Sequence, residues 1–111
     1  MARIVERSEW AADPLRWVGE WEGGDANISV IFHTSEGPGH GPGLHWHPYP
    51  ETFIIQEGSA LFTIGDLEVE ARPGQILVAP AKVPHGFKSV GPGIYRSINI
   101  HTGGTFITHW L

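Results

Sequence analysis

Glycine and proline interrupt this chain every few residues from Gly37 onward, and this spacing limits the possible folds more than any other feature of the sequence. The chain has 15 glycines and 9 prolines in 111 residues. Both residues disfavour the interior of a helix, glycine through its backbone entropy and proline through its missing N–H. We therefore expect short elements joined by tight turns rather than long helices.

The segments between these turns have the composition of β-strands. Residues 28–32 and 52–56 are rich in β-branched and aromatic side chains. Residues 67–70 alternate apolar and acidic side chains, which predicts one buried and one solvated face. Residues 76–79 are predicted to be a short buried strand, and residues 94–101 a longer strand. Together with the remaining runs, they predict eight to ten strands at intervals of about 8–12 residues, which is typical of an all-β sandwich or barrel.

The first 27 residues differ from the rest of the chain. Trp10, Trp17 and Trp21 dominate this segment, which has room for only a short helical turn. We predict an irregular N-terminal arm over 1–27 that packs on the barrel or crosses to a partner subunit, and a single β domain over 28–111. A chain of this length can bury a real core as one domain.

The composition excludes several classes of protein. Because the chain has no cysteine, it cannot form disulfides, bind zinc through cysteine or use thiol catalysis. The net charge of −5 and the lack of a basic cluster argue against nucleic-acid binding. No apolar run approaches the roughly 18 residues of a membrane-spanning helix, and the first residues lack the apolar region of a signal peptide. We expect no membrane partner and a cytoplasmic location.

Two of the seven histidines are placed to share one face of a strand. His45 and His47 are two residues apart, and Glu51 has the same parity. Two imidazoles and a carboxylate in one pocket suit divalent first-row metals. His85 is a fourth candidate, which a closed β structure could bring close. The alternative is a pair of histidines whose ring nitrogens are satisfied by backbone hydrogen bonds.

The spacing of these residues resembles that of the cupin family. The first cupin motif is matched at every fixed position by Gly39-x5-His45-x-His47-x3-Glu51-x6-Gly58. The second motif is matched in part by Gly74-x5-Pro80-x-Lys82-x2-His85-x3-Ser89. Lys82 stands where the family has glycine, and Ser89 where it has asparagine. Neither position is a metal ligand in the family, but the shape of the turn at Lys82 is in question.

The resemblance implies a fold, a cofactor and an assembly. The expected fold is a single-domain antiparallel jelly-roll β-barrel. The expected cofactor is one divalent transition metal (Fe, Mn, Ni or Zn) held by His45, His47, Glu51 and His85. The expected assembly is a homodimer, since one barrel has little cover for its own sheet edges.

Two functions are compatible with such a site. A metal with an open coordination position can act as a Lewis acid on a small polar organic molecule, as in an oxygenase, an isomerase or a lyase. The alternative is a non-catalytic cupin that binds or senses a sugar or an organic acid. We favour the enzyme, although fold by itself does not imply function.

Residues 94–101 carry two further candidates for the pocket. One face of this strand would present Tyr95, Ser97, Asn99 and His101, and the other Ile94, Arg96, Ile98 and Ile100. Parity does not decide which face lines the cavity. If the first one does, Asn99 and His101 would contact a ligand. The other histidines, His33, His40 and His109, are expected at the surface or at strand edges.

Overall fold

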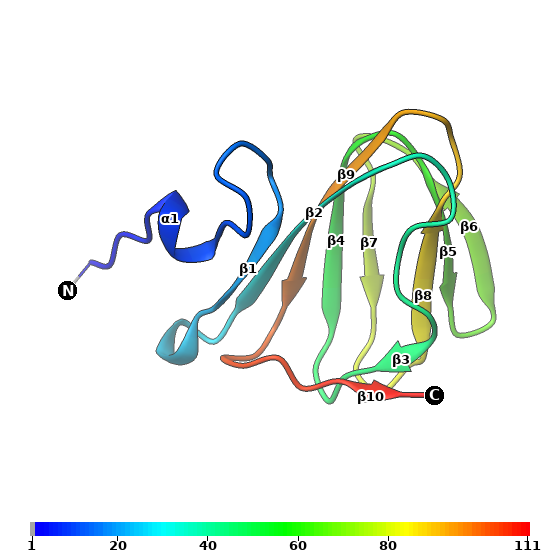
Figure 1. Ribbon diagram of the computed structural model, residues 1–111. Helices are drawn as coiled ribbons and strands as arrows, with labels where there is room; N and C mark the ends of the chain where they lie inside the picture. The colour runs from blue at the N-terminus through cyan, green and yellow to red at the C-terminus, as the bar shows by residue number, and fades with distance from the viewer. Residues whose placement is uncertain (1) are drawn as a thin grey trace.

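Two antiparallel five-stranded sheets lie face to face and enclose the interior (Figure 1). This arrangement, seen in a computed structural model that describes residues 2–111, confirms the prediction of an all-β jelly roll. The β9 sheet has the order β1-β2-β9-β4-β7, and the β8 sheet has the order β10-β3-β8-β5-β6. The strands are β1 (Gly19–Glu22), β2 (Ser29–Glu36), β3 (His45–Trp46), β4 (Glu51–Glu57), β5 (Ala60–Ile64), β6 (Leu67–Ala71), β7 (Ile76–Ala79), β8 (His85–Ser89), β9 (Ile94–His101) and β10 (His109–Trp110).

The N-terminal segment lies against the outside of the β9 sheet. It contains one turn of helix, α1 (Arg7–Trp10), and β1 is followed by the short 3-10 helix η1 (Gly24–Ala26). The Trp10 ring stacks on Phe32 of β2 with centroids 4.0 Å apart, and Trp17 packs beside both. Because β1 pairs with β2, the sheet begins inside the stretch assigned to the arm, and a domain boundary at residue 28 stays a prediction. Among the described residues, no helix is long and apolar enough to cross a membrane.

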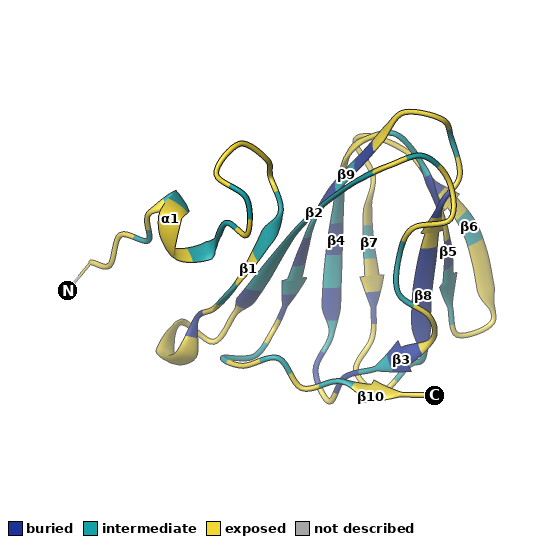
Figure 2. Ribbon diagram, viewed as in Figure 1, coloured by how far each residue is buried: buried dark blue, intermediate teal, exposed yellow. Residues whose placement is uncertain are grey.

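Aromatic side chains from both sheets form the apolar half of the interior. Figure 2 shows buried positions on β4 and β8, one strand from each sheet. Phe62 on β5 is fully buried and stacks on Phe87 of β8 at 4.8 Å. Phe53 of β4 meets Phe62 edge to face at 4.9 Å, so this trio joins the two sheets. The whole buried cluster consists of Phe53, Ile55, Ala60, Phe62, Ala71, Ala79, Phe87 and Tyr95.

The strand predicted to be fully buried, β7, is buried on one face only. Leu77 and Ala79 point toward the core, but Ile76 and Val78 are 65% and 53% exposed. The prediction was wrong because β7 is the edge strand of the β9 sheet, and nothing in residues 2–111 covers its outer side.

The β9 strand faces the interior with its polar side. Its buried residues are Tyr95, Ser97, Asn99 and His101, while Ile98 and Ile100 point outward. Since directly paired residues of antiparallel strands share a face, the register extends this outward apolar surface across the sheet. Two rows result, one of Phe32, Ile98, Ile54 and Ile76 and one of Val30, Ile100, Thr52 and Val78. We call these two rows the outer apolar face.

The turn from β4 to β5 depends on Gly58. Its φ of +69° is a conformation that residues with a side chain adopt only with strain. A Cβ at this position would lie 2.2 Å from the carbonyl oxygen of Ile94. The close approach of these two backbones therefore requires glycine.

Candidate metal centre

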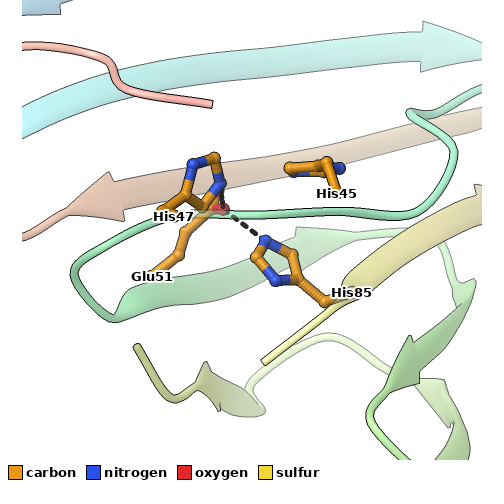
Figure 3. A group of neighbouring side chains, drawn as sticks. All are labelled: His45, His47, Glu51 and His85. Carbon is orange, nitrogen blue, oxygen red and sulfur yellow. Dashed lines mark hydrogen bonds and ion pairs between the residues drawn. The ribbon is translucent and has the colours of Figure 1, made fainter. Parts of the chain in front are cut away.

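The four residues predicted as metal ligands come together at one end of the barrel (Figure 3). His45 lies on β3 and pairs directly with His85, the first residue of β8. His47 follows β3, and Glu51 is the first residue of β4 in the opposite sheet. All four side chains are buried, and their ligand atoms lie within 4.8 Å of one another. The arrangement could hold a metal ion.

One oxygen of the Glu51 carboxylate lies between two imidazoles. Glu51 Oε1 is 3.0 Å from His47 Nε2 and 2.9 Å from His85 Nε2. Figure 3 shows both imidazoles pointing toward this oxygen, with His45 beside them. The His45 ring lies 4.4 Å from the His85 ring, centroid to centroid. Glu51 therefore sits at the junction of the cluster.

The other ring nitrogen of each histidine is held by a backbone carbonyl. A carbonyl only accepts hydrogen bonds, so Nδ1 carries the proton and Nε2 of the neutral ring has a free lone pair. The acceptors are the carbonyls of Gly43 (2.7 Å from His45 Nδ1), Ile107 (2.8 Å from His47 Nδ1) and Val83 (2.9 Å from His85 Nδ1). All three histidines thus have the tautomer that a metal ligand needs.

This tautomer makes the centre of the cluster a site for a cation. The lone pairs of His47 Nε2 and His85 Nε2 face a carboxylate oxygen, so all three atoms are acceptors. Such a group repels itself unless a proton or a metal ion lies among its members. Adjacent ligands at right angles and about 2.1 Å from a metal would be about 3.0 Å apart, which is close to the distance of Glu51 Oε1 from each of the two nitrogens. The donor set therefore fits a divalent transition metal.

The electrostatics of the cluster also favour positive charge. Burial alone would raise the pKa of Glu51, but the contacts with His101, His47 and His85 outweigh it and hold this pKa well below its usual range. Burial opposes protonation of His47, but its bonds to Glu51 and to the Ile107 carbonyl raise its pKa overall. Burial lowers the pKa of His45, against the weaker effect of the Gly43 carbonyl. The Glu51 carboxylate therefore stays ionised and can balance the charge of a bound cation.

The turn before β8 is hydrogen-bonded to the backbone of one of the candidate ligands. Lys82 donates its backbone N–H to the carbonyl of His47 at 2.8 Å. Its φ of +67° belongs to the left-handed region, which glycine adopts most easily. Lys82 thus takes this conformation at the position where the cupin motif has glycine, and the turn still holds the backbone of His47.

A cavity of about 310 Å³ lies beside the cluster. Its apolar walls come from both sheets and from the C-terminal segment, and they include Ile31, Phe53, Phe87, Phe106 and Trp110. Besides the cluster, its polar lining residues are Glu20, His33, Asn99, His101 and Thr108. A small molecule in this cavity would lie against the candidate metal ligands.

Asn99 and His101 both lie in the wall of this cavity. The Ser97 hydroxyl donates to Asn99 Oδ1 at 2.8 Å, which leaves the amide nitrogen as the end available to a ligand. His101 Nε2 lies 3.1 Å from Glu51 Oε2. On its other side, His101 Nδ1 is 2.7 Å from the Tyr49 hydroxyl. The structure places both residues where a ligand could reach them, and their roles stay predictions.

Sequence reasoning missed His33, which was expected at the surface or at an edge. It is half-buried and lines the cavity, because β2 pairs with β9 and places His33 opposite the buried Ser97. The signal was the parity that His33 shares with Ile31, which also lines the cavity. His40 and His109 are exposed, as expected.

Comparisons with known proteins agree with the resemblance drawn from the motif spacing. A family model for the cupin domain matches residues 32–101. No curated protein matches the chain. A solved structure from Klebsiella pneumoniae with a double-stranded beta-helix domain has a TM-score of 0.73 at 19% identity, covering 97% of this chain and 96% of that one.

Two enzymes have a similar fold over part of their length. An oxalate oxidase has a TM-score of 0.70 at 18% identity and is matched over 78% of this chain and 47% of its own. The Bacillus subtilis oxalate decarboxylase has a TM-score of 0.69 at 25% identity, over 77% of this chain and 24% of its own. The chain thus spans less than half of either enzyme, and the likeness concerns the fold.

Proposed function

This chain belongs to the cupin family, and on that basis we propose that it binds one divalent transition metal (Fe, Mn, Ni or Zn) through His45, His47, Glu51 and His85. The observation that carries the proposal is the convergence of acceptor atoms on one point. Three imidazoles have Nδ1 tied to carbonyls, and two of the free Nε2 atoms lie 2.9 and 3.0 Å from Glu51 Oε1. A structural cluster of histidines satisfied by backbone bonds would not need to aim these nitrogens at the carboxylate.

We further propose that the protein is a small metalloenzyme for a polar organic molecule, with oxygenase, isomerase or lyase chemistry. When bound, the metal would supply a Lewis acid. The cavity of about 310 Å³ limits the substrate to a small molecule, and aromatic rings make up much of its apolar wall. Asn99 and His101 present polar atoms from the side of β9.

One observation favours the alternative, a non-catalytic ligand-binding cupin. Apart from Glu51, the only carboxylate among the described residues that line the cavity belongs to Glu20, which is exposed. A carboxylate general base beside the metal is therefore missing from the described cavity wall, although an imidazole could take that role. Turnover of a bound ligand would support the enzyme, whereas stabilisation by the ligand without turnover would support the binder.

Metal loading is the direct test of the site. With free metal at about 100 times Kd, the metal-free protein should gain about 2.7 kcal/mol in free energy of unfolding. His47→Ala should lose this gain, because it removes one ligand and the carbonyl-held tautomer. The measurement is thermal unfolding with and without Mn, Fe, Ni or Zn. His109→Ala is the matched control, since His109 is exposed and should leave the gain unchanged.

The same measurement at lower pH checks the ligands independently. Metal needs neutral imidazoles, so the gain should shrink as pH falls through about 6.5 and below. The raised pKa of His47 means that protons already compete at the upper end of this range. The absence of any gain at pH 7.5 with all four metals would refute the metal site.

We also propose that the protein is a homodimer formed through the outer apolar face. Ile76 and Val78 lie on this face and are 65% and 53% exposed. Apolar residues continue across β4 and β9 in register with them. A contiguous apolar surface of this kind is typical of an interface between subunits.

A double variant, Ile76→Lys with Val78→Lys, tests this interface. Four lysines would meet across a two-fold axis, so we expect the wild-type dimer to become a monomer in analytical ultracentrifugation at micromolar concentration. Leu67→Lys, at an exposed position on the β8 sheet, should leave the dimer intact. A monomeric wild type, or a double variant that stays dimeric, would rule out this interface.

A further inference from the structure

The wall of the cavity carries no positive side chain. None of the seven lysines and arginines lines the cavity, and all seven lie within the described residues. Arg96 points outward and pairs with Glu57 at 3.0 Å. Lys88 donates to the carbonyl of Gly41. A bound metal would therefore supply the permanent positive charge of the cavity.

The other hydrogen-bonding groups of the wall belong to histidine, asparagine and threonine side chains, besides the exposed Glu20. His33 Nε2 is buried and has no hydrogen-bond partner among residues 2–111, and burial, followed by the charge of His40, lowers the pKa of His33. His101 Nε2 is likewise buried and lies 3.1 Å from Glu51 Oε2. Asn99 offers its amide nitrogen. These groups can bind the oxygens of a ligand, and none of them is a lysine or an arginine.

The charges at the site add up to one positive charge. A divalent metal held by the Glu51 carboxylate and three imidazoles, which are neutral when they bind a metal, leaves one positive charge. Apart from the histidines, the one further ionisable side chain in the described cavity lining is that of Glu20, which is exposed and carries a carboxylate. A second negative charge on the ligand would face Phe53, Phe87 and Phe106 without a counter-charge, which costs free energy.

We propose that the cavity selects a monoanionic α-hydroxy or α-keto acid and discriminates against dicarboxylates. The two adjacent oxygens of such an acid suit an open metal site, its single charge balances that of the loaded cluster, and Asn99 binds it from the β9 side. This inference rests on the proposed metal site. It also separates this chain from the oxalate enzymes of similar fold, because oxalate carries two charges.

The test compares lactate with tartronate, which replaces the methyl group of lactate by a second carboxylate and keeps the same α-hydroxy acid group. Metal loading is first verified by elemental analysis, and binding to the loaded protein is then measured by titration calorimetry at pH 7.5. We expect lactate to bind at least about tenfold more tightly than tartronate, and more tightly than the neutral hydroxyacetone. In water the second carboxylate makes tartronate the better chelator, so this order would be a property of the cavity.

Two variants connect the preference to named residues. Asn99→Leu should weaken lactate binding by about 3- to 10-fold, as expected for one hydrogen bond, and leave metal affinity unchanged. Gln56→Leu, which removes an exposed amide on β4, is its control and should change neither affinity. Glu20→Gln should strengthen tartronate binding by about threefold and change lactate binding less, since the second carboxylate no longer meets a negative rim.

The outcomes separate this inference from the proposal it rests on. Tartronate binding that equals or exceeds lactate binding, or no binding of lactate to the loaded protein, would overturn the selectivity and leave the metal site standing. Failure of the protein to load metal would refute the metal site itself, and the selectivity with it.

Discussion

Glu51→Gln is expected to lower the affinity for divalent metal by more than about 100-fold, because loss of an outer partner alone typically costs about 10- to 100-fold. Glu51 contributes the only negative charge of the cluster, and its oxygen is the atom that two histidines approach at 2.9 and 3.0 Å. The amide is of similar size but neutral. The affinity is measured at pH 7.5 by competition with a fluorescent metal chelator.

Glu57→Gln is the matched control for this variant. Glu57 lies at the end of the same strand, is exposed and pairs with Arg96 outside the cavity. Its substitution should leave metal affinity unchanged. If Glu51→Gln binds metal within about threefold of wild type, the carboxylate is not a ligand, and the cluster owes its geometry to hydrogen bonding alone.

Phe62→Ala is expected to destabilise the protein by about 3–5 kcal/mol, the range for a fully buried phenylalanine. Phe62 has no exposed surface, stacks on Phe87 and meets Phe53 edge to face. Since both neighbours also line the cavity, the space left by the ring would loosen the wall beside the metal centre. The free energy of unfolding is measured by urea titration of metal-free protein in EDTA.

Leu61→Ala serves as the control on the same strand. Leu61 points to the opposite face and is 40% exposed, so its truncation should cost much less, on the order of 0.5 kcal/mol. Should Phe62→Ala fail to fold, Phe62→Leu leaves a smaller cavity and allows the measurement. A loss below about 1 kcal/mol for Phe62→Ala would show that the aromatic trio does not hold the two sheets together.

Much of the candidate metal centre could be predicted from local pattern. The parity of His45 and His47 is a property of extended backbone and needs no tertiary information. Glu51 follows at the same parity, and the structure places it against His47. His85 is 34 residues beyond Glu51, so it was only a candidate that a closed β structure could bring close until the cupin motif connected it to the others. Local geometry cannot bring two hairpins from different sheets together.

The groups that form hydrogen bonds with the ligands could not be predicted from the sequence. The carbonyl of Ile107 accepts from His47 Nδ1 across 60 positions of sequence, and backbone carbonyls carry no residue-specific signal. Tyr49 contacts His101 because the C-terminal segment and the loop after β3 meet there. His33 was missed because its role depends on which strand pairs with β2.

What the sequence by itself determined is most of the strands beyond residue 27, the turns between them and the ligand spacing, because these follow from periodicity, glycine and proline. What only the tertiary structure decided is which face of each strand points inward. Strand 94–101 has one apolar and one polar face, and hydrophobic burial alone would turn Ile98 and Ile100 into the core. The barrel instead encloses Asn99 and His101 beside the buried Glu51. Buried polar groups need polar partners, and closure of the two sheets places them together.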